Sequence, residues 1–367
     1  MSLILHLLAA DGSRGAQAQA RLLVDELNAA VDVRHEAMTV YGGPPGNLQA
    51  EHRLAVPAGA RLTQDLRAAR VLRRALLELK PAVVVAHGSE PLRLLTWSRW
   101  RGRVVYHRIG VGGPALRRSW RRALHRSLIG RADRIVAVSS DAADDVRVFT
   151  TRSVTVIPNL RRPEDFSPRR QHSGRLRVLF LGALTPSKRP DRFLDIVEAL
   201  AAAGHPVSAS IVGDGPERSR LASRAFTLSV ELSGPTADPA RVLGDHDVLL
   251  FTSDRHGEGM PGVLIEAGLC ELAAVSTPVP GARDVIEHAA TGFIASTVAE
   301  FAQTVVTLDE NRSALAQIGR RARLRCEAAF SPAAVTAAWA SVLEAVVVLP
   351  VTSPARDVAA SRRVGRG

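Results

Sequence analysis

The stretch that decides the fold is residues 252–268, TSDRHGEGMPGVLIEAG. The apolar run 247–251 before it has the pattern of a buried strand, and the apolar residues from Val263 onward predict a helix that starts just after Pro261. Glu258 then lies in a glycine-containing loop, and Glu266 lies about one turn into the helix. A helix N-terminus presents N–H groups to anions, and carboxylates accept hydrogen bonds from hydroxyls. This segment can therefore hold a diphosphate and its sugars.

Glu258 and Glu266 are separated by seven residues, within the sequence EGMPGVLIEA. A bare pair of glutamates at this spacing is also typical of a charged helix face. The surrounding Gly-x-Pro-x-Val-Leu-x-Glu-Ala pattern, however, resembles the E-x7-E signature of the retaining glycosyltransferases of family 4. The resemblance implies an α/β protein with the GT-B fold, in which two Rossmann-like domains with parallel sheets face each other across a cleft.

Composition is consistent with two domains. The chain has 367 residues and a hydrophobic content of 46%, enough for two sizeable cores. Its two cysteines, Cys270 and Cys326, are too few for a disulfide framework or a metal cluster, which favours packing roles and a reducing cytoplasm. The apolar start predicts a first strand rather than a signal peptide, and no uninterrupted apolar run is long enough to span a membrane. We expect a cytoplasmic protein, with peripheral attachment to the inner face of the membrane as an alternative.

Positive charge is concentrated in one segment. The net charge is +12, and eleven arginines occur between Pro91 and Ala132 without any acidic residue, which indicates an anionic partner. From Leu116 to Leu128 apolar residues recur at helical spacing. Such a helix could lie on an anionic membrane surface, form an acceptor pocket for a phosphorylated lipid or polyanionic glycan, or simply pack on its own sheet. Nucleic acid is not expected, because no nucleic-acid-binding module occurs. The residues assigned to membrane or anionic acceptor are Trp97, Trp100, Arg117, Arg118, Arg121 and Arg122.

The N-terminal part has the pattern of a Rossmann-like domain: a strand at 3–9, a glycine loop at 11–17 and a helix. In that loop Gly15 resembles the end of the family's Gly-Gly-Ala-Glu/Gln sequence, although Arg14 replaces the first glycine. Arg14 either adds charge to the donor pocket or faces solvent. Two later strands end at His87 and His107. The resemblance places His107 where it faces the transferred sugar, whereas His87 is expected to be a hydrogen-bonded loop residue.

Two departures from the family pattern concern the hinge and the diphosphate. Residues 154–159, VTVIPN, resemble the hinge, but Leu160–Arg162 replace its usual continuation. Lys188 matches one of the two cations that the family places on the donor diphosphate, and Ala183 stands where the other, an arginine, is expected. Lost cationic charge raises the barrier for a leaving diphosphate unless another residue supplies it. The candidates are Arg14, Arg189 and Arg255.

We predict an acceptor-side domain at 1–165 and a nucleotide-sugar-binding domain at 166–330. A helix at 331–347 is expected to cross back to the first domain, followed by a disordered basic tail at 348–367.

The resemblance implies sugar transfer from a nucleotide-diphosphate donor to a hydroxyl acceptor such as a glycolipid or a cell-surface glycan precursor, with retention and without a metal or cofactor. It assigns the donor ribose to Glu266, the sugar hydroxyls to Glu258, and a polarising or orienting contact with the sugar to His107. The remaining donor-binding residues are Gly15, Lys188, Arg189, Gly259, Met260, Gly262 and Val263.

The departures at Arg14, Ala183 and the hinge motivate an alternative, a catalytically silent sugar-nucleotide-binding partner protein. A membrane-surface adaptor without sugar chemistry is a second alternative, based on the basic helix. Epimerase or phosphorylase chemistry on the same fold is a third.

Overall fold

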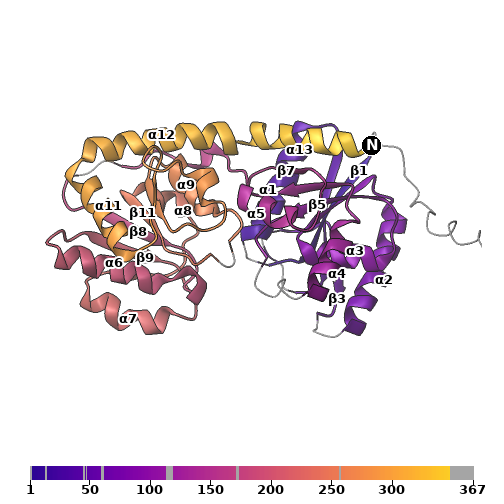
Figure 1. Ribbon diagram of the computed structural model, residues 1–367, viewed down its shortest axis with the longest axis horizontal. Helices are drawn as coiled ribbons and strands as arrows, with labels where there is room; N and C mark the ends of the chain where they lie inside the picture. The colour runs from indigo at the N-terminus through magenta and orange to yellow at the C-terminus, as the bar shows by residue number, and fades with distance from the viewer. Residues whose placement is uncertain are drawn as a thin grey trace, which may run out of the picture.

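The computed structural model has two α/β domains, each built on one parallel sheet and joined by a linker at residues 157–176 (Figure 1). It describes residues 2–12, 15–43, 46, 48–58, 62–112, 119–170, 173–255 and 258–347. Arg14, Arg117, Arg118 and the predicted tail at 348–367 lie outside the described residues. The two parallel sheets confirm the fold class that the sequence predicted.

The first sheet has seven strands in the order β3-β2-β1-β4-β5-β6-β7. Central strand β4, VVVAH, is buried along its whole length, as expected where helices cover both faces of a parallel sheet. The strands are β1 Leu3–Ala10, β2 Arg34–Tyr41, β3 His52–Val56, β4 Val83–His87, β5 Arg103–Arg108, β6 Arg134–Ala137 and β7 Val154–Val156. The helices are α1 Gly15–Ala30, α2 Leu62–Leu79, α3 Ser89–Ser98, α4 Ser119–Ile129 and α5 Ser140–Arg147.

The second sheet has six strands in the order β10-β9-β8-β11-β12-β13. The strand order reverses between β8 and β11, where doubly wound sheets bind their ligands. The strands are β8 Arg177–Leu181, β9 Ser208–Val212, β10 Glu231–Ser233, β11 Val248–Phe251, β12 Ala273–Ser276 and β13 Phe293–Ile294. The helices are α6 Pro190–Ala202, α7 Arg218–Thr227, α8 Pro239–Gly244, α9 Gly262–Leu269, α10 Ala282–Val285, α11 Val298–Glu310, α12 Arg312–Phe330 and α13 Pro332–Val347.

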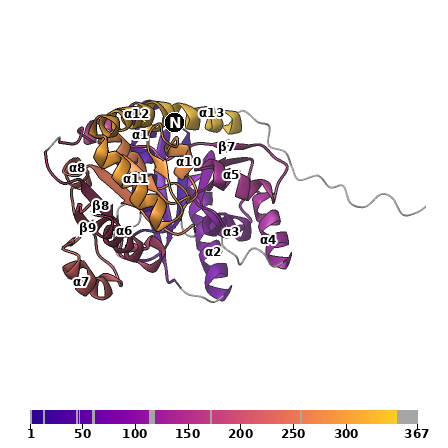
Figure 2. The same ribbon diagram turned by 60° about the vertical axis from the view of Figure 1, so that its left-hand side comes forward.

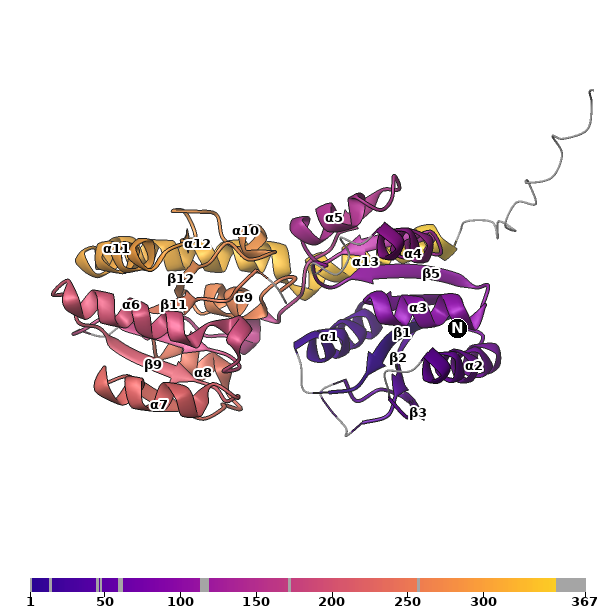
Figure 3. The same cartoon turned by 60° about the horizontal axis from the view of Figure 1, so that its bottom comes forward.

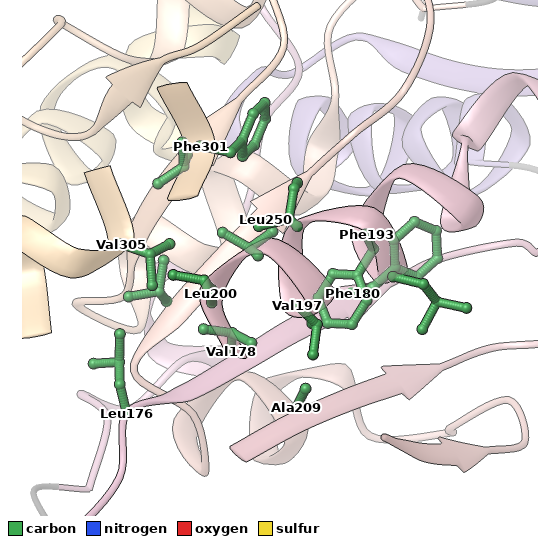
Figure 4. Packing of buried hydrophobic residues seen from close by; sticks show 14 of the residues in the cluster. Leu176, Val178, Phe180, Phe193, Val197, Leu200, Ala209, Leu250, Phe301 and Val305 are labelled. Atoms are coloured by element: carbon green, nitrogen blue, oxygen red, sulfur yellow. The ribbon is translucent and has the colours of Figure 1, made fainter. Parts of the chain in front are cut away.

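An apolar core stabilises the second domain (Figure 4). Phe180 of β8 packs edge-on against Phe193 of α6, with ring centroids 6.0 Å apart. Phe301 of α11 is fully buried in the same cluster, and α6 contacts α11. The packing of these two helices over the sheet holds β8 and β11, and hence the loops that follow them, in fixed positions.

Helices α12 and α13 run along both domains, as the yellow-orange ribbon of Figure 1 shows. Helix α12 packs so closely on the second domain that a Cβ added at Gly319 would lie 2.0 Å from the Glu271 carbonyl oxygen. Helix α13 follows Ser331 and contacts α1 and β5 of the first domain, where Trp339 is buried.

The segment Arg312–Val347 is long and apolar enough to cross a membrane by length and composition alone. The sequence did not lead us to expect such a segment, because no uninterrupted apolar run occurs in it. Within its apolar window, 39% is buried inside the protein, and core helices pass the same test.

Candidate functional site

The candidate donor site forms where β11 ends beside the loop that follows β8. The hydroxyl of Thr252, directly after β11, donates hydrogen bonds to the carbonyl oxygens of Lys188 at 3.1 Å and Arg189 at 2.9 Å. These bonds hold the short 3-10 helix Pro186–Lys188 against the segment that carries Glu258.

Lys188 and Glu258 form an ion pair between Nζ and Oε1. The Glu258 side chain is only 11% exposed, while that of Lys188 is 30% exposed, so the pair stays accessible from the lysine side. The ammonium group also lies 5.4 Å from the centroid of the Phe251 ring. The two side chains predicted to bind the sugar and the diphosphate therefore lie side by side, although they are far apart in the sequence.

Glu266 is paired with an arginine that the sequence analysis did not assign to the site. Arg161, in the linker, contacts Glu266 Oε1 through Nε at 2.8 Å and through Nη2 at 2.7 Å. Its Nη1 donates to Gln19 Oε1 of α1 at 2.5 Å and to the Leu160 carbonyl oxygen at 2.8 Å. Arg161 thus connects α9 of the second domain with α1 of the first. The altered hinge at Leu160–Arg162 was the sequence signal that marked this position.

The loop before α9 lies directly against the first domain. A Cβ added at Gly259 would be 2.2 Å from the carbonyl oxygen of Ile109, which follows β5, so a larger residue would push the domains apart there. The side-chain amide of Asn159, in the hinge, donates to the Met260 carbonyl oxygen at 3.1 Å. Helix α9 then begins at Gly262. The candidate site therefore takes residues from both domains.

The other predicted donor-binding residues surround this site. Gly15 opens α1, and within the described part of the chain no atom lies within 4 Å of a Cβ added there. Val263 is half-buried in the first turn of α9. The Arg189 guanidinium is held by Asp191 at 2.9 to 3.1 Å and lies 3.6 Å from Asp254, so its charge is already balanced by carboxylates.

His107 lies in the interior of the first domain rather than beside Lys188. Its ring is 5% exposed, its Nδ1 is hydrogen-bonded to His87 Nδ1 at 3.0 Å, and it packs edge-on against Trp339 of α13, with centroids 5.1 Å apart. No hydrogen bond between described residues joins His107 to Glu258, and its Nε2 has no such partner. These contacts do not support the expectation that His107 faces the sugar. His87, expected in a loop, lies at the end of β4 and is buried beside it.

The two histidines belong to a row of four that crosses one face of the first sheet. His6 is hydrogen-bonded to His35 and to His87, and His87 to His107, each at 3.0 Å. Burial lowers the pKa of His35 and of His87 to about 4. Burial and the neighbouring imidazoles also lower the pKa of His6 and His107 well below its ordinary value, so the row is neutral at pH 7. Among the residues described, no group of three or more His, Cys, Asp or Glu could hold a metal ion.

The first turns of the basic helix leave its apolar stripe exposed. In α4, Trp120 is 59% exposed and Leu124 43% exposed, whereas Leu128 is buried. The Arg121 guanidinium lies over the Trp120 ring at 5.1 Å, and Arg122 is exposed. The interpretation of a helix that simply covers its own sheet is therefore wrong for the first turns of α4.

The two tryptophans that were assigned to the acceptor surface from the sequence, Trp97 and Trp100, are partly buried. Trp97 is half-buried, with the Arg93 guanidinium 5.2 Å from its ring, and Trp100 packs against the core of the first domain. Gly102 leaves room for the Trp100 ring, since a Cβ added there would lie 2.0 Å from it. Trp120, not these two, presents an aromatic ring to solvent on this face.

Two protein-family models match the chain. Residues 14–164 match the model described as Glycosyltransferase Family 4, and residues 175–311 match the one described as Glycosyl transferases group 1. The boundary between the two matches falls in the linker that carries Arg161.

Curated relatives share part of the chain. The Phosphatidylinositol N-acetylglucosaminyltransferase GPI3 subunit of Saccharomyces cerevisiae is 27% identical over 195 residues, which cover 48% of this chain and 43% of that protein. The Poly(ribitol-phosphate) alpha-N-acetylglucosaminyltransferase of Staphylococcus aureus is 22% identical over 212 residues, 56% of this chain and 42% of that protein. The chain thus matches less than half of the length of these relatives.

Solved structures share the fold over nearly the whole chain. HepE from Anabaena, in complex with UDP and glucose, has a TM-score of 0.76 at 20% identity and covers 94% of this chain and 100% of its own. TarM has a TM-score of 0.77 at 12% identity, with coverage of 93% and 98%. These structures show that the chain has the GT-B fold, and the two family models show that it belongs to the family 4 and group 1 glycosyltransferases.

Proposed function

We propose that the protein transfers N-acetylglucosamine from a UDP-sugar donor to a hydroxyl acceptor, with retention at the anomeric carbon. The Lys188–Glu258 ion pair carries the proposal, because it places a cation for a diphosphate against a carboxylate for hydroxyl groups, and Glu266 of the following helix α9 supplies a second carboxylate. The names of the curated relatives, which are N-acetylglucosaminyltransferases, support the choice of sugar. The UDP complex of HepE supports the choice of nucleotide.

In this proposal Glu266 accepts hydrogen bonds from the donor ribose, and Glu258 accepts them from the transferred sugar. Lys188 and the backbone at 262–263 bind the diphosphate. Negative charge develops on the diphosphate as the glycosidic bond breaks, so positive groups already fixed there lower the barrier. The diphosphate itself takes the acceptor proton, and neither a metal nor a protein general base is needed.

The first test is a thermal-shift and hydrolysis screen with UDP-GlcNAc, UDP-glucose, GDP-mannose, ADP-glucose and dTDP-glucose. We expect stabilisation by UDP-GlcNAc and slow release of UDP that persists in EDTA. Donor stabilisation without turnover, even with acceptors added, would instead favour the silent sugar-nucleotide binder. Stabilisation by none of these donors would contradict the assignment of the site.

The catalytic role of the ion pair is tested by Glu258→Gln, which keeps the side-chain shape and removes the charge. We expect UDP release or transfer to fall about 100-fold or more, the size of effect seen when a preorganised polar contact is lost. Glu198→Gln is the matched control, because Glu198 is an exposed carboxylate of α6 paired with Arg224. Equal turnover in the two variants would contradict the role of Glu258.

Retention is tested on the product. UDP-GlcNAc carries an α-linked sugar, so proton NMR of the transfer product should show an α-glycosidic linkage. A β-linked product would show inversion and would overturn this part of the proposal.

The exposed apolar side chains of α4 support a second proposal, that the acceptor lies at an anionic membrane surface. Trp120 and Leu124 are exposed on the same helix as Arg121 and Arg122, a combination that suits the interface of an anionic bilayer. Trp120→Ala/Leu124→Ala should lower recovery with phosphatidylglycerol vesicles about tenfold in flotation. Phe226→Ala is the control, since Phe226 is 88% exposed on α7 of the other domain. Equal recovery on anionic and neutral vesicles would contradict the membrane proposal.

A further inference from the structure

The charge balance of the candidate site depends on Arg161. Each of the two carboxylates holds one cation: Glu258 holds Lys188, and Glu266 holds Arg161. If donor hydroxyls take over both carboxylates, both cations lose their partners while a diphosphate with about two negative charges arrives. The site already contains the charge needed to bind it.

Arg161 is a partly buried residue whose main chain and side chain are both held by contacts within the site. Its backbone N–H donates to the Phe330 carbonyl oxygen at 2.9 Å, which fixes the main chain where α12 ends. A Cβ added at Gly262 would lie 2.0 Å from Arg161 Nη2, so the guanidinium occupies the space directly over the start of α9. Its side chain is 19% exposed. The glycine at 262 provides the room for this arginine.

Of the candidates for the charge expected at Ala183, Arg14 lies outside the described residues and Arg255 is exposed. Ala183 is exposed and uncharged, and Arg189 is balanced by Asp191 and Asp254. Among the described residues, the side chain of Arg161 contacts one carboxylate, that of Glu266, and two neutral oxygens, those of Gln19 and Leu160. A guanidinium is also suited to phosphate, because its planar fork offers several N–H donors at once.

We propose that Arg161 is the second diphosphate-binding cation, and that its guanidinium moves from Glu266 to the diphosphate when the donor binds. The ribose hydroxyls take its place on Glu266. This inference rests on the proposed function of the site and adds a residue that the family pattern does not supply. Because Arg161 also holds Gln19, the exchange breaks a contact between α9 and α1 and couples donor binding to the contact between the domains.

The test uses three ligands that separate phosphate from ribose: UDP, uridine and inorganic pyrophosphate, titrated by calorimetry. Arg161→Ala should weaken UDP and pyrophosphate about tenfold or more, the loss expected for a charge-assisted hydrogen bond. It should leave uridine binding unchanged or tighter, because Glu266 becomes free. Arg162→Ala is the control, since Arg162 is the next residue and pairs with Glu26 instead.

Glu266→Gln should change the affinities for pyrophosphate and for uridine in the directions opposite to those expected for Arg161→Ala. Pyrophosphate should bind about threefold to tenfold tighter, because Arg161 no longer has a carboxylate to leave. Uridine should bind more weakly, because the ribose loses its carboxylate. Arg161→Lys, which keeps the charge, should recover part of the UDP affinity.

The outcomes that overturn the inference are distinct from failure of the proposed function. If Arg161→Ala binds UDP as tightly as the wild type or tighter, Arg161 only blocks Glu266. If the affinities of Arg161→Ala for UDP and for uridine fall equally, Arg161 only supports the hinge. If the wild type binds neither UDP nor GDP, ADP or dTDP, the donor site itself is wrong.

Discussion

The two domains have the same strand order around their centres but very different interiors. In the first sheet, a face covered by helices carries the histidine row His35, His6, His87 and His107. In the second sheet, the corresponding interior is hydrocarbon, with phenylalanines from a strand and two helices (Figure 4). Figures 2 and 3 show that both sheets are nonetheless covered by helices in the same layered manner. One fold thus accommodates either a polar or an apolar interior.

The difference shows what a buried polar row requires. Four neutral imidazoles have four N–H donors and four lone pairs, and the three bonds between them use three of each. The remaining donor and acceptor lie at the ends, His35 Nε2 and His107 Nε2, both without a partner among the described residues. All four rings must therefore adopt matching tautomers, whereas the phenylalanine core only has to fill space. We therefore expect the stability of the first domain to depend on pH more strongly than that of the second, in which the partly buried His246 has a lowered pKa.

The largest expected effect is acid unfolding of the first domain. The folded pKa values of the row lie below the ordinary value of 6.5, so the unfolded chain takes up protons between pH 6.5 and about 4 while the folded domain does not. Stability present above pH 6.5 is therefore lost as the pH falls, by roughly 1 kcal/mol per pH unit for each histidine. His125 of the first domain adds to this effect, and His246 is the corresponding residue of the second domain.

Tryptophan fluorescence can follow this transition separately. The four tryptophans, at 97, 100, 120 and 339, lie in the first domain or in the helix that packs on it, whereas far-ultraviolet circular dichroism reports both domains. We expect the fluorescence transition to come at higher pH. If fluorescence and circular dichroism change at the same pH, the first domain is not the more acid-sensitive of the two. His246→Gln, in the second domain, is the control and should leave the pH of the fluorescence transition unchanged.

The next largest effect concerns the apolar interior. Phe193→Ala should destabilise the second domain by about 3–5 kcal/mol, because it leaves a cavity beside Phe180 in a fully buried cluster. Urea unfolding followed by circular dichroism should show the loss at pH 7, while the fluorescence transition stays in place. Phe226→Ala, at an exposed ring, is the control. An equal shift of both signals would mean that the domains unfold as one unit.

A smaller effect is expected when either end of the row is removed. His35→Phe and His107→Phe should each cost about 1–3 kcal/mol, because each leaves one nitrogen of its neighbour unpaired. Turnover measured on the folded fraction should be equal in the two variants. If only His107→Phe loses turnover, His107 acts on the sugar as the family resemblance implied, and its buried position changes when the donor binds.

The smallest expected signal comes from the two thiols of the second domain. Burial raises the pKa of both Cys270 and Cys326 to about 12, and both are packed between α9 and neighbouring helices. Labelling by 4,4′-dithiodipyridine should be negligible at pH 5.5, even if tryptophan fluorescence at that pH shows that the first domain has begun to unfold. Rapid labelling at that pH would show that the second domain opens too. Full labelling in urea is the control.

The sequence predicted much of the fold, because hydrophobic periodicity and glycine loops are local. The strand, loop and helix around Glu258 and Glu266 were expected with nearly the observed bounds, since Pro261 sets the helix start and the preceding run is fully buried. The continuous helical segment through α12 and α13 was less visible, because Ser331 interrupts the pattern. The exposed stripe of α4 was also uncertain, since periodicity does not show what an apolar face packs against.

The site itself was only partly predictable. Glu258 and Lys188 were both named from their motifs, but nothing local showed that they form an ion pair. The pairing of Glu266 with Arg161 joins residues 105 positions apart and depends on how the linker lies between the domains. The histidine row was missed for the same reason, since its members are on four different strands.

The sequence by itself determined most of the order of strands and helices, because this order depends on short-range patterns of apolar, glycine and proline residues. The expectation of a GT-B fold and the choice of Glu258 and Glu266 as site residues came from the resemblance to the family motif. Only the tertiary structure decided which charges meet and which polar side chains become buried. Parallel strands that are distant in the sequence place His6, His87 and His107 side by side, and the linker brings Arg161 onto Glu266. Ion pairs and hydrogen bonds act over a few ångströms in space, and sequence distance does not set that separation.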